Sequence, residues 1–215
     1  MTDLLPIYIG WDSREPVAYE VCAYSLWRRT SLPLMVSPLK LNALRHFKFV
    51  WREDDLLAST EFTFTRFLTP ILARRAGLTG WAVFCDCDFL WLADPAELTA
   101  LLDPAFAVMV VKHDHRPPET TKFLGQRQLL YPRKNWSSLI AFNLDHDGNT
   151  RLTLDAVNTE EPSWLHQFRW LPDDLIGALP EEWNWLEGYS PTTIAPKAVH
   201  FTRGGPWFPD WRDVA

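Results

Sequence analysis

The chain has 215 residues, with 21 basic and 27 acidic side chains, so its formal net charge is −6. This charge excludes a protein that binds nucleic acid mainly by electrostatic attraction. The length predicts one domain with a substantial core, and 47% hydrophobic with 22% charged residues is typical of an ordered globular protein. The 12 Trp side chains add a faint indication of a carbohydrate ligand, because indole faces suit sugar rings.

The ends of the chain and its cysteines bear on location. No apolar run reaches the roughly 20 residues that a membrane-spanning helix requires, so we expect no transmembrane segment. The first residues lack the basic and apolar regions of a secretory leader, which favours the cytoplasm and leaves peripheral membrane association open. Cys22, Cys85 and Cys87 lack the spacing of a disulfide framework, which suits a reducing compartment. The sequence gives no indication of oligomeric state.

The first 76 residues predict a strand, a helix, a strand and a second helix. An apolar run over residues 6–10 ends in glycine, and residues 15–29 follow with Val17, Val21 and Tyr24 or Ser25 at helical spacing. Residues 32–39 form the second strand candidate. Residues 61–76 carry the clearest helical stripe, which consists of Phe64, Phe67, Leu68, Ile71 and Leu72.

The alternation continues beyond this point. Continuous apolar runs at residues 81–85 and 106–111 predict strands covered on both faces, with a short helix between them that Asp94 caps and Pro95 begins. Residues 112–134 predict a long loop, residues 138–144 a further strand, and residues 198–201 a short one. We therefore predict an α/β fold with a mainly parallel sheet and a small irregular C-terminal part.

An acidic pair marks the end of one buried strand. Asp86 and Asp88 follow the apolar run at residues 81–85, where unpaired carboxylates are costly unless a cation or hydrogen-bond donors meet them. Oxygen ligands of this kind suit Mg²⁺ or Mn²⁺. Two strand-end caps are the alternative interpretation, and a thiolate site built from Cys85 and Cys87 is disfavoured because only one further cysteine exists.

Asp-x-Asp after an apolar strand resembles the metal motif of nucleotide-sugar glycosyltransferases of the GT-A fold. Four further segments occur in the order seen in the retaining, glycogenin-like (family 8-type) members: residues 65–67, residues 136–143, residues 173–176 and residues 200–207. The resemblance covers roughly residues 6 to 208. It implies one GT-A domain over residues 1–215, with a Rossmann-like nucleotide-binding half at 1–111 and a half at 112–215 that completes the acceptor and metal sites.

The resemblance also implies an activity and its ligands. The expected reaction moves a sugar with retention from a nucleotide diphosphate, for which we predict a UDP-sugar, to a saccharide or other hydroxyl acceptor. Asp86 would contact the ribose and the metal, Asp88 would ligate the metal, and His200 would be the third protein ligand. A Mn²⁺ or Mg²⁺ ion would neutralise the departing diphosphate. His200 on its short apolar strand is alternatively a core histidine.

Nucleotide-binding roles carry over to both ends of the chain. Asp12 matches the place of the family's base and ribose contacts, and Arg14 beside it would lie against the base or a phosphate. A loop aspartate that caps the next helix fits Asp12 equally. Arg66 would close over the nucleotide and order the acidic pair, or be a solvated helix charge. Gly204 and Gly205 would let the backbone approach phosphate oxygens.

One departure from the family concerns the diphosphate. Gly205 stands where the family usually carries a lysine before Pro-Trp, so we expect Arg203, or else Lys112 or Lys122, to supply the missing cation.

A second departure concerns the reacting carbon. Asp173 and Asp174 match the family's Asp-Gln pair there, so the resemblance implies positioning by Asp173 and chemistry by Asp174. Two acids that favour a helix start are the alternative interpretation.

Two other polar clusters receive weaker interpretations. Residues 113–115 contain two histidines and an aspartate, which we interpret as an acceptor-side loop or plain surface because adjacent side chains do not easily converge on one ion. Residues 181–185 combine carboxylates and indoles, for which a turn packed by two tryptophans is preferred over a sugar contact.

Two other functions compete with the transferase. A sugar nucleotidyltransferase normally shows a Gly-rich basic loop after its first strand, and residues 10–13 do not. A nucleotide-sugar-binding domain without turnover fits the missing lysine.

Overall fold

The computed structural model describes residues 4–55, 58–114 and 132–209. Its elements are β1 (Leu5–Gly10), α1 (Pro16–Arg29), β2 (Leu34–Leu39), α2 (Leu41–His46), the 3₁₀ helix η1 (Thr65–Leu68), α3 (Thr69–Arg75), β3 (Trp81–Cys85), β4 (Phe89–Trp91), α4 (Pro95–Thr99), β5 (Val108–Val111), η3 (Trp136–Ser138), β6 (Leu139–Asn143), η4 (Asp147–Arg151), α5 (Leu154–Thr159), α6 (Pro162–His166), η5 (Asp173–Leu175), β7 (Ile176–Leu179), η6 (Glu181–Asn184), β8 (Trp185–Leu186) and β9 (Ala198–His200).

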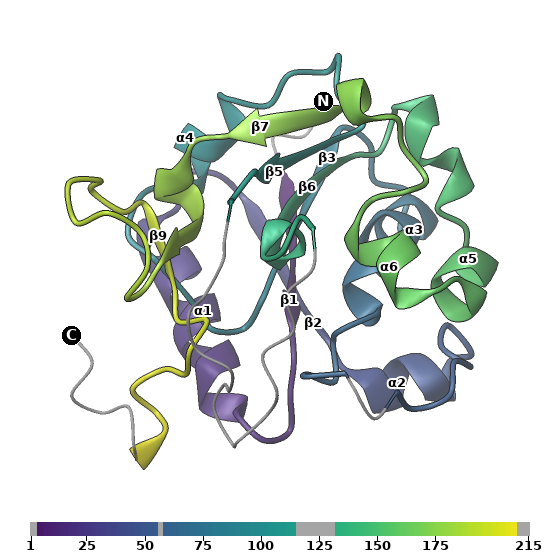
Figure 1. The fold of residues 1–215 in the computed structure, drawn as a ribbon, viewed down its shortest axis with the longest axis horizontal. Coiled ribbons are helices and arrows are strands. Elements are labelled where there is room, and N and C mark those ends of the chain that lie inside the picture. The colour runs from purple at the N-terminus through teal and green to yellow at the C-terminus, as the bar shows by residue number, and fades with distance from the viewer. Residues whose placement is uncertain (1–3, 56–57, 115–131, 210–215) are drawn as a thin grey trace.

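A six-stranded sheet organises the domain, in the order β2-β1-β3-β6-β5-β7 (Figure 1). The strands β2, β1, β3, β5 and β7 run in one direction, and β6 runs against its neighbours β3 and β5. The carboxyl ends of β1, β3 and β5 therefore lie at one edge, where open α/β sheets bind ligands. The expectation of one α/β domain with a mainly parallel sheet flanked by helices is confirmed.

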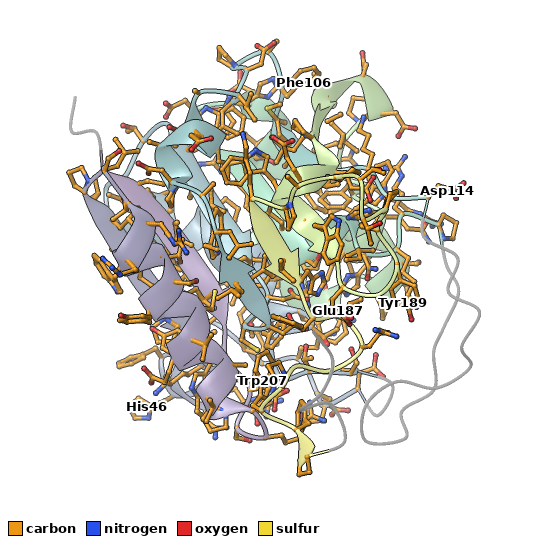
Figure 2. The ribbon with its side chains drawn as sticks, turned by 90° about the vertical axis from the view of Figure 1, so that its left-hand side faces the viewer. His46, Phe106, Asp114, Glu187, Tyr189 and Trp207 are labelled. Atoms are coloured by element: carbon orange, nitrogen blue, oxygen red, sulfur yellow. The ribbon has the colours of Figure 1, made fainter. Side chains whose placement is uncertain are left out.

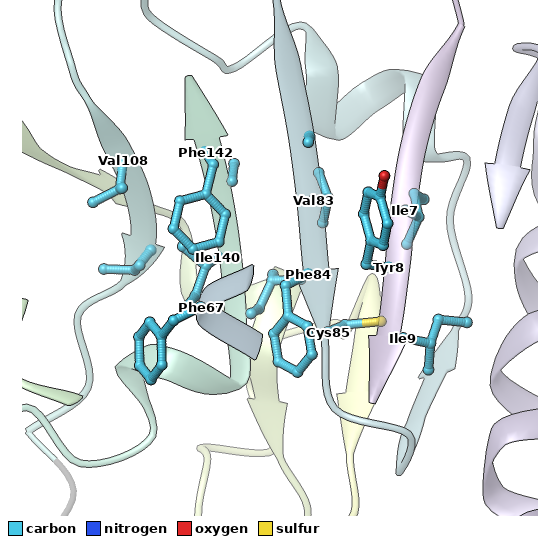
Figure 3. Close-up of a cluster of buried hydrophobic side chains, with 14 of the residues drawn as sticks. Ile7, Tyr8, Ile9, Phe67, Val83, Phe84, Cys85, Val108, Ile140 and Phe142 are labelled. Carbon is cyan, nitrogen blue, oxygen red and sulfur yellow. The ribbon is translucent and has the colours of Figure 1, made fainter. Parts of the chain in front are cut away.

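The core lies between this sheet and the helices on its two faces. Every residue of β1, β5 and β6 is buried, which is the pattern expected for strands covered on both sides. Figure 3 shows buried side chains of β1, β3, β5 and β6, together with Phe67 of η1, which belong to one core cluster. Three of the tryptophans, Trp91, Trp170 and Trp183, are fully buried and belong to the core rather than to a sugar site.

Two helices differ from expectation in detail. The stripe of Val17, Val21 and Tyr24 is exposed, with Tyr24 67% exposed, and α1 instead buries the neighbouring stripe that contains Ala18, Cys22 and Leu26. The small side chains of that stripe let the helix pack closely on the sheet. The helix expected over residues 61–76 divides into η1 and α3, because proline at the first turn of α3 fits the beginning of a helix better than its interior.

A smaller sheet, in the order β4-β9-β8, includes two strands from the C-terminal part of the chain. β9 pairs antiparallel with β4, so His200 lies opposite Phe89, one residue after Asp88. The chain reaches β4 directly from the carboxyl end of β3 through the acidic pair. The two sheets thus bring residues that are more than 100 positions apart in the sequence to the same edge of the fold.

Candidate functional site

The acidic pair lies where β3 ends, and the backbone there is held by the last residue of η3, just before β6. The Asp86 N–H donates to the Ser138 carbonyl oxygen at 2.9 Å, and both carboxylates are largely buried. Cys85 and Cys87 turn into the core. Burial raises the pKa of the Cys87 thiol well above its ordinary value, so this group favours its neutral form and is a poor metal ligand.

Arg66 neutralises one member of the pair. Its guanidinium lies 2.8 Å from Asp86 Oδ1 and donates to the Ser137 carbonyl oxygen at 2.7 Å. The same group lies over the rings of Phe84 and Phe62, at 5.1 and 5.3 Å. With its side chain only 7% exposed, Arg66 is not a solvated helix charge. It pairs with the Asp86 carboxylate, and its role toward a nucleotide stays a prediction.

His200 completes a group with the composition of a metal site. Its Nε2 lies 3.4 Å from Asp88 Oδ1 and 4.0 Å from Asp86 Oδ2, and one ligand atom from each of the three residues lies within 4.8 Å of the others. A ligand set of one imidazole nitrogen and carboxylate oxygens suits Mn²⁺ or Mg²⁺ better than a cysteine-rich ligand set would. The three residues named from the sequence are therefore brought together on the described part of the chain.

A cavity of about 320 Å³ opens beside this group. Its lining includes Arg66, Asp86, Asp88 and His200, together with Ser163, His166 and Gln167. The volume is at the lower end of the range for small-molecule sites. Its lining combines both halves of the sequence, and Lys134, which is buried, also contributes to it.

Glu15 is a cavity residue that the sequence did not single out. It is buried just before α1, and its Oε2 accepts a hydrogen bond from the Trp207 indole N–H at 3.1 Å. Burial, assisted by the nearby Asp88 carboxylate, raises the pKa of Glu15 to about 8. A glutamate before a proline has many ordinary explanations, so no local pattern could have marked it. No local pattern marked Lys134, His166 or Gln167 either, so the sequence did not identify these cavity residues.

Asp12 and Arg14 form a structural contact between two loops. The Asp12 carboxylate, 1% exposed, accepts hydrogen bonds from the Arg14 guanidinium and from the backbone N–H groups of Arg14 and Glu61. Burial raises the pKa of Asp12, but these bonds outweigh it and the net pKa is lowered. Arg14 also donates to the Ser59 carbonyl oxygen. Neither residue lines the cavity among the described residues, and the Asp12 side chain does not cap α1.

The segment around Arg203 packs on its own neighbours. The Arg203 guanidinium forms an ion pair with Glu187, at 2.7 Å, and lies over the Tyr189 ring (Figure 2 labels both partners). A Cβ on Gly205 would come within 2.1 Å of the Trp207 ring, so close packing requires this glycine. Gly204 has a φ of +133°, which favours glycine. Among the described residues, the cavity lining includes neither Arg203 nor Gly204 nor Gly205.

The second acidic pair is on the surface. Asp173 and Asp174 are exposed, and Asp173 forms an ion pair with Arg133. Both residues precede the amino end of β7, and β7 runs in the same direction as β3. They do not line the cavity in the described part of the chain. The geometry therefore gives no support to a role at the reacting carbon, and that role stays a prediction.

The two weaker clusters separate into individual contacts. Lys112, His113 and Asp114 line a second cavity of about 460 Å³, together with Glu181 and Tyr189. His115 and Lys122 lie outside the described residues. In the 181–185 cluster, Trp183 is buried in the core, Glu182 forms an ion pair with Lys197, and Asn184 hydrogen-bonds His200.

Comparison with solved structures defines the class of fold. The chain resembles the glycosyltransferase GlyE of Streptococcus pneumoniae (TM-score 0.61, 14% identity, 95% of this chain and 56% of that chain). It also resembles a glycosyltransferase involved in the glycosylation of the major capsid of PBCV-1 (0.58, 11%, 93% and 94%). It also resembles the galactosyltransferase LgtC (0.53, 11%, 97% and 90%). These likenesses establish the GT-A glycosyltransferase fold. The chain spans about half the length of another such structure, the bifunctional glycosyltransferase WbbM.

The sequence comparison identifies the family. The chain is 50% identical over 213 residues to Protein CDI of Arabidopsis thaliana, and the matched region covers 96% of this chain and 81% of the plant protein. The chain belongs to the family of this protein. No family model matches it. In the described ranges 4–55, 58–114 and 132–209, no helix has the length and apolar character needed to span a membrane.

Proposed function

We propose that this protein is a metal-dependent glycosyltransferase that moves a sugar from a nucleotide diphosphate donor to a hydroxyl acceptor. The observation that carries the proposal is the convergence of Asp86, Asp88 and His200 beside a cavity, at the ligand-binding edge of a GT-A fold. A uridine diphosphate donor and retention of the anomeric configuration complete the proposal, on the strength of the glycogenin-like motif order. The three free cysteines are consistent with a cytoplasmic location.

The chain's own residues would prepare the donor's phosphates for departure. Asp86, Asp88 and His200 would hold Mn²⁺ or Mg²⁺, which supplies Lewis-acid neutralisation of the leaving diphosphate. Arg66 would keep the Asp86 carboxylate oriented between ligand exchanges, because it is paired and buried beside it. The guanidinium also lies over the apolar rings of Phe62 and Phe84, which support its position beside Asp86.

Lys134 is a better placed candidate than Arg203 for the missing diphosphate cation. Lys134 is buried and contributes to the cavity lining together with Asp86 and Asp88, whereas Arg203 does not line this cavity among the described residues. Lys134→Ala should weaken UDP binding far more than uridine binding, because only UDP carries phosphates. Arg203→Ala is the matched control, with small and equal losses for the two ligands. The opposite pattern would restore Arg203 to this role.

The activity itself is tested with a panel of UDP-hexoses in Mn²⁺, by measuring free UDP with and without candidate acceptors. A transferase releases UDP faster when an acceptor is present, and Asp88→Asn abolishes the release. Binding of UDP without any release would favour a nucleotide-sugar-binding domain. Release of pyrophosphate from UTP and a sugar 1-phosphate would favour a nucleotidyltransferase. The anomeric configuration of the product, read by NMR, tests retention.

A further inference from the structure

Asn184 lies behind His200, on the side away from the acidic pair. It is the last residue of η6 and is fully buried, and it does not line the cavity among the described residues. Its Oδ1 lies 3.0 Å from His200 Nδ1. A buried polar side chain needs hydrogen-bond partners for stability. The partners of Asn184 also determine how its amide group is oriented.

The orientation of the Asn184 amide follows from its other contacts. Its Nδ2 donates to Ser138 Oγ at 2.9 Å and to the Asn135 carbonyl oxygen at 3.3 Å. Ser138 Oγ uses its own hydrogen to donate to the same carbonyl at 2.7 Å. Since a carbonyl oxygen only accepts, the amide NH₂ must face Asn135, and the amide oxygen must face His200.

This orientation determines which imidazole nitrogen carries the hydrogen. An amide oxygen also only accepts, so His200 Nδ1 must be protonated to bond it, and in the neutral ring Nε2 then keeps its lone pair. Nε2 is the atom that faces Asp86 and Asp88. Phe89 stacks on the ring at 4.6 Å, with an interplanar angle of 19°, which limits the ring's tilt.

We infer that Asn184 is a positioning residue that holds neutral His200 in the Nδ1–H tautomer, so that the Nε2 lone pair points at the space between Asp86 and Asp88. Partners that bond the far nitrogen of a ligating histidine typically change metal affinity 10- to 100-fold. The metal-binding consequence rests on the proposed function. The tautomer itself does not, because the hydrogen bonds that set it involve only the protein.

The network also connects the histidine to the acidic strand end. Ser138, which accepts from Asn184, holds the Asp86 backbone N–H through its own carbonyl oxygen. One buried network therefore orients two of the three metal-ligand candidates relative to each other. The sequence pattern at residues 181–185 was interpreted as a turn packed by two tryptophans. That interpretation does not include the hydrogen bond between Asn184 and His200.

The first experiment measures the tautomer directly in the metal-free wild-type protein. Long-range ¹H–¹⁵N NMR of ¹⁵N-histidine-labelled protein at about pH 8, where an ordinary imidazole is neutral, distinguishes a protonated from an unprotonated ring nitrogen. His200→Gln assigns the signals. We expect protonated Nδ1 and unprotonated Nε2. An Nε2–H tautomer in the wild type would overturn the inference.

The second experiment compares Mn²⁺ affinities by calorimetry in the presence of UDP. Asn184→Leu removes the acceptor and should weaken Mn²⁺ binding 10- to 100-fold. Asn184→Asp keeps an acceptor for Nδ1–H and should stay within about threefold of wild type, even though a buried charge lowers its melting temperature. A merely structural asparagine would give the reverse order, with Asn184→Asp the more damaging substitution.

A matched control is available in Asn149, another fully buried asparagine. It donates to the carbonyl oxygens of Ala107 and Asn143 and accepts from the Trp170 indole, away from the metal-ligand candidates. Asn149→Leu should lower the melting temperature but leave Mn²⁺ affinity unchanged. An affinity loss equal to that of Asn184→Leu would contradict the inference.

The outcomes separate this inference from the proposed function. If the wild type shows the Nδ1–H tautomer but binds neither Mn²⁺ nor Mg²⁺, the metal assignment fails and the tautomer inference stands. If the wild type binds Mn²⁺ and Asn184→Leu binds it equally well, the inference fails and the metal site stands. Should Asn184→Leu not fold, the wild-type tautomer and the Asn184→Asp affinity decide.

Discussion

The two acidic pairs that the sequence analysis named as site candidates differ in burial, in partners and in their place on the sheet. Asp86 and Asp88 follow the carboxyl end of a central strand, with side chains 14% and 16% exposed, and Arg66 and His200 lie against them. Asp173, 81% exposed, and its neighbour Asp174 precede the amino end of the edge strand β7. In the sequence both are short acidic motifs next to an apolar strand.

The difference comes from strand direction and solvent. Carboxylates that are desolvated must be compensated by cations or donors, so burial concentrates interactions at the first pair. The second pair remains hydrated, and its ion pair with Arg133 is of the exposed kind that contributes about 0.2 to 1 kcal/mol. An acidic pair is therefore a site candidate only when its strand delivers it to the buried, ligand-binding edge.

The largest expected effect comes from Asp88→Asn. Removing a charged ligand from a group of three should weaken Mn²⁺ binding by more than about a hundredfold, and with it the Mn²⁺-dependent binding of UDP. Calorimetric titration of Mn²⁺, then of UDP in its presence, measures both. If Asp88→Asn binds Mn²⁺ and UDP with wild-type affinity, Asp88 is not a metal ligand, and the first pair no longer differs from the second as a metal site.

Arg66→Met tests the compensation of the first pair. It leaves Asp86 buried beside apolar rings without its cation, which should cost roughly 3 kcal/mol in the free energy of unfolding. Urea unfolding measures the loss. Asp86→Asn in the same background is the control, because it removes the uncompensated charge and should recover part of the stability. Strictly additive losses would mean that the two side chains are not coupled.

Glu15→Gln tests the acidic environment near the first pair. The folded protein raises the pKa of Glu15 to about 8 from an ordinary 4.5, so it binds the proton more tightly than the unfolded chain does. Stability of the metal-free protein should therefore fall as pH rises from about 4.5 to about 8. Glu15→Gln should raise the melting temperature at pH 8.5 and change it little at pH 5. Parallel curves for the two proteins would contradict the raised pKa.

Asp174→Asn has the smallest expected effect. As an exposed side chain outside the cavity, it should change turnover by less than about threefold and stability by about 0.5 kcal/mol or less. Turnover with saturating donor and thermal unfolding are the measurements. A hundredfold fall in turnover with unchanged UDP affinity would instead place Asp174 at the reacting carbon, as the family resemblance implies, and would end the contrast between the pairs.

Some parts of the fold and site were readable from local pattern. The apolar run at Trp81–Cys85 became β3 with the predicted bounds, and Asp94 caps α4 through the Ala96 N–H. The helix before β3 was recognised, but Pro70 divided it. The buried face of α1 was misjudged, because the alternation of apolar and small residues does not tell which stripe meets the sheet.

The sequence by itself determined the strand–helix alternation and the acidic pair at the end of a buried strand, because hydrophobic periodicity and desolvation act locally. Only the tertiary structure decided which polar residues meet that pair. Arg66 reaches it from a 3₁₀ helix, and His200 reaches it through the antiparallel pairing of β9 with β4. Asn184 lies behind His200 and bonds it by a buried hydrogen bond. Asp173 and Asp174 are kept away by the direction of β7. Such contacts depend on strand order and direction, which residue spacing along the chain does not encode.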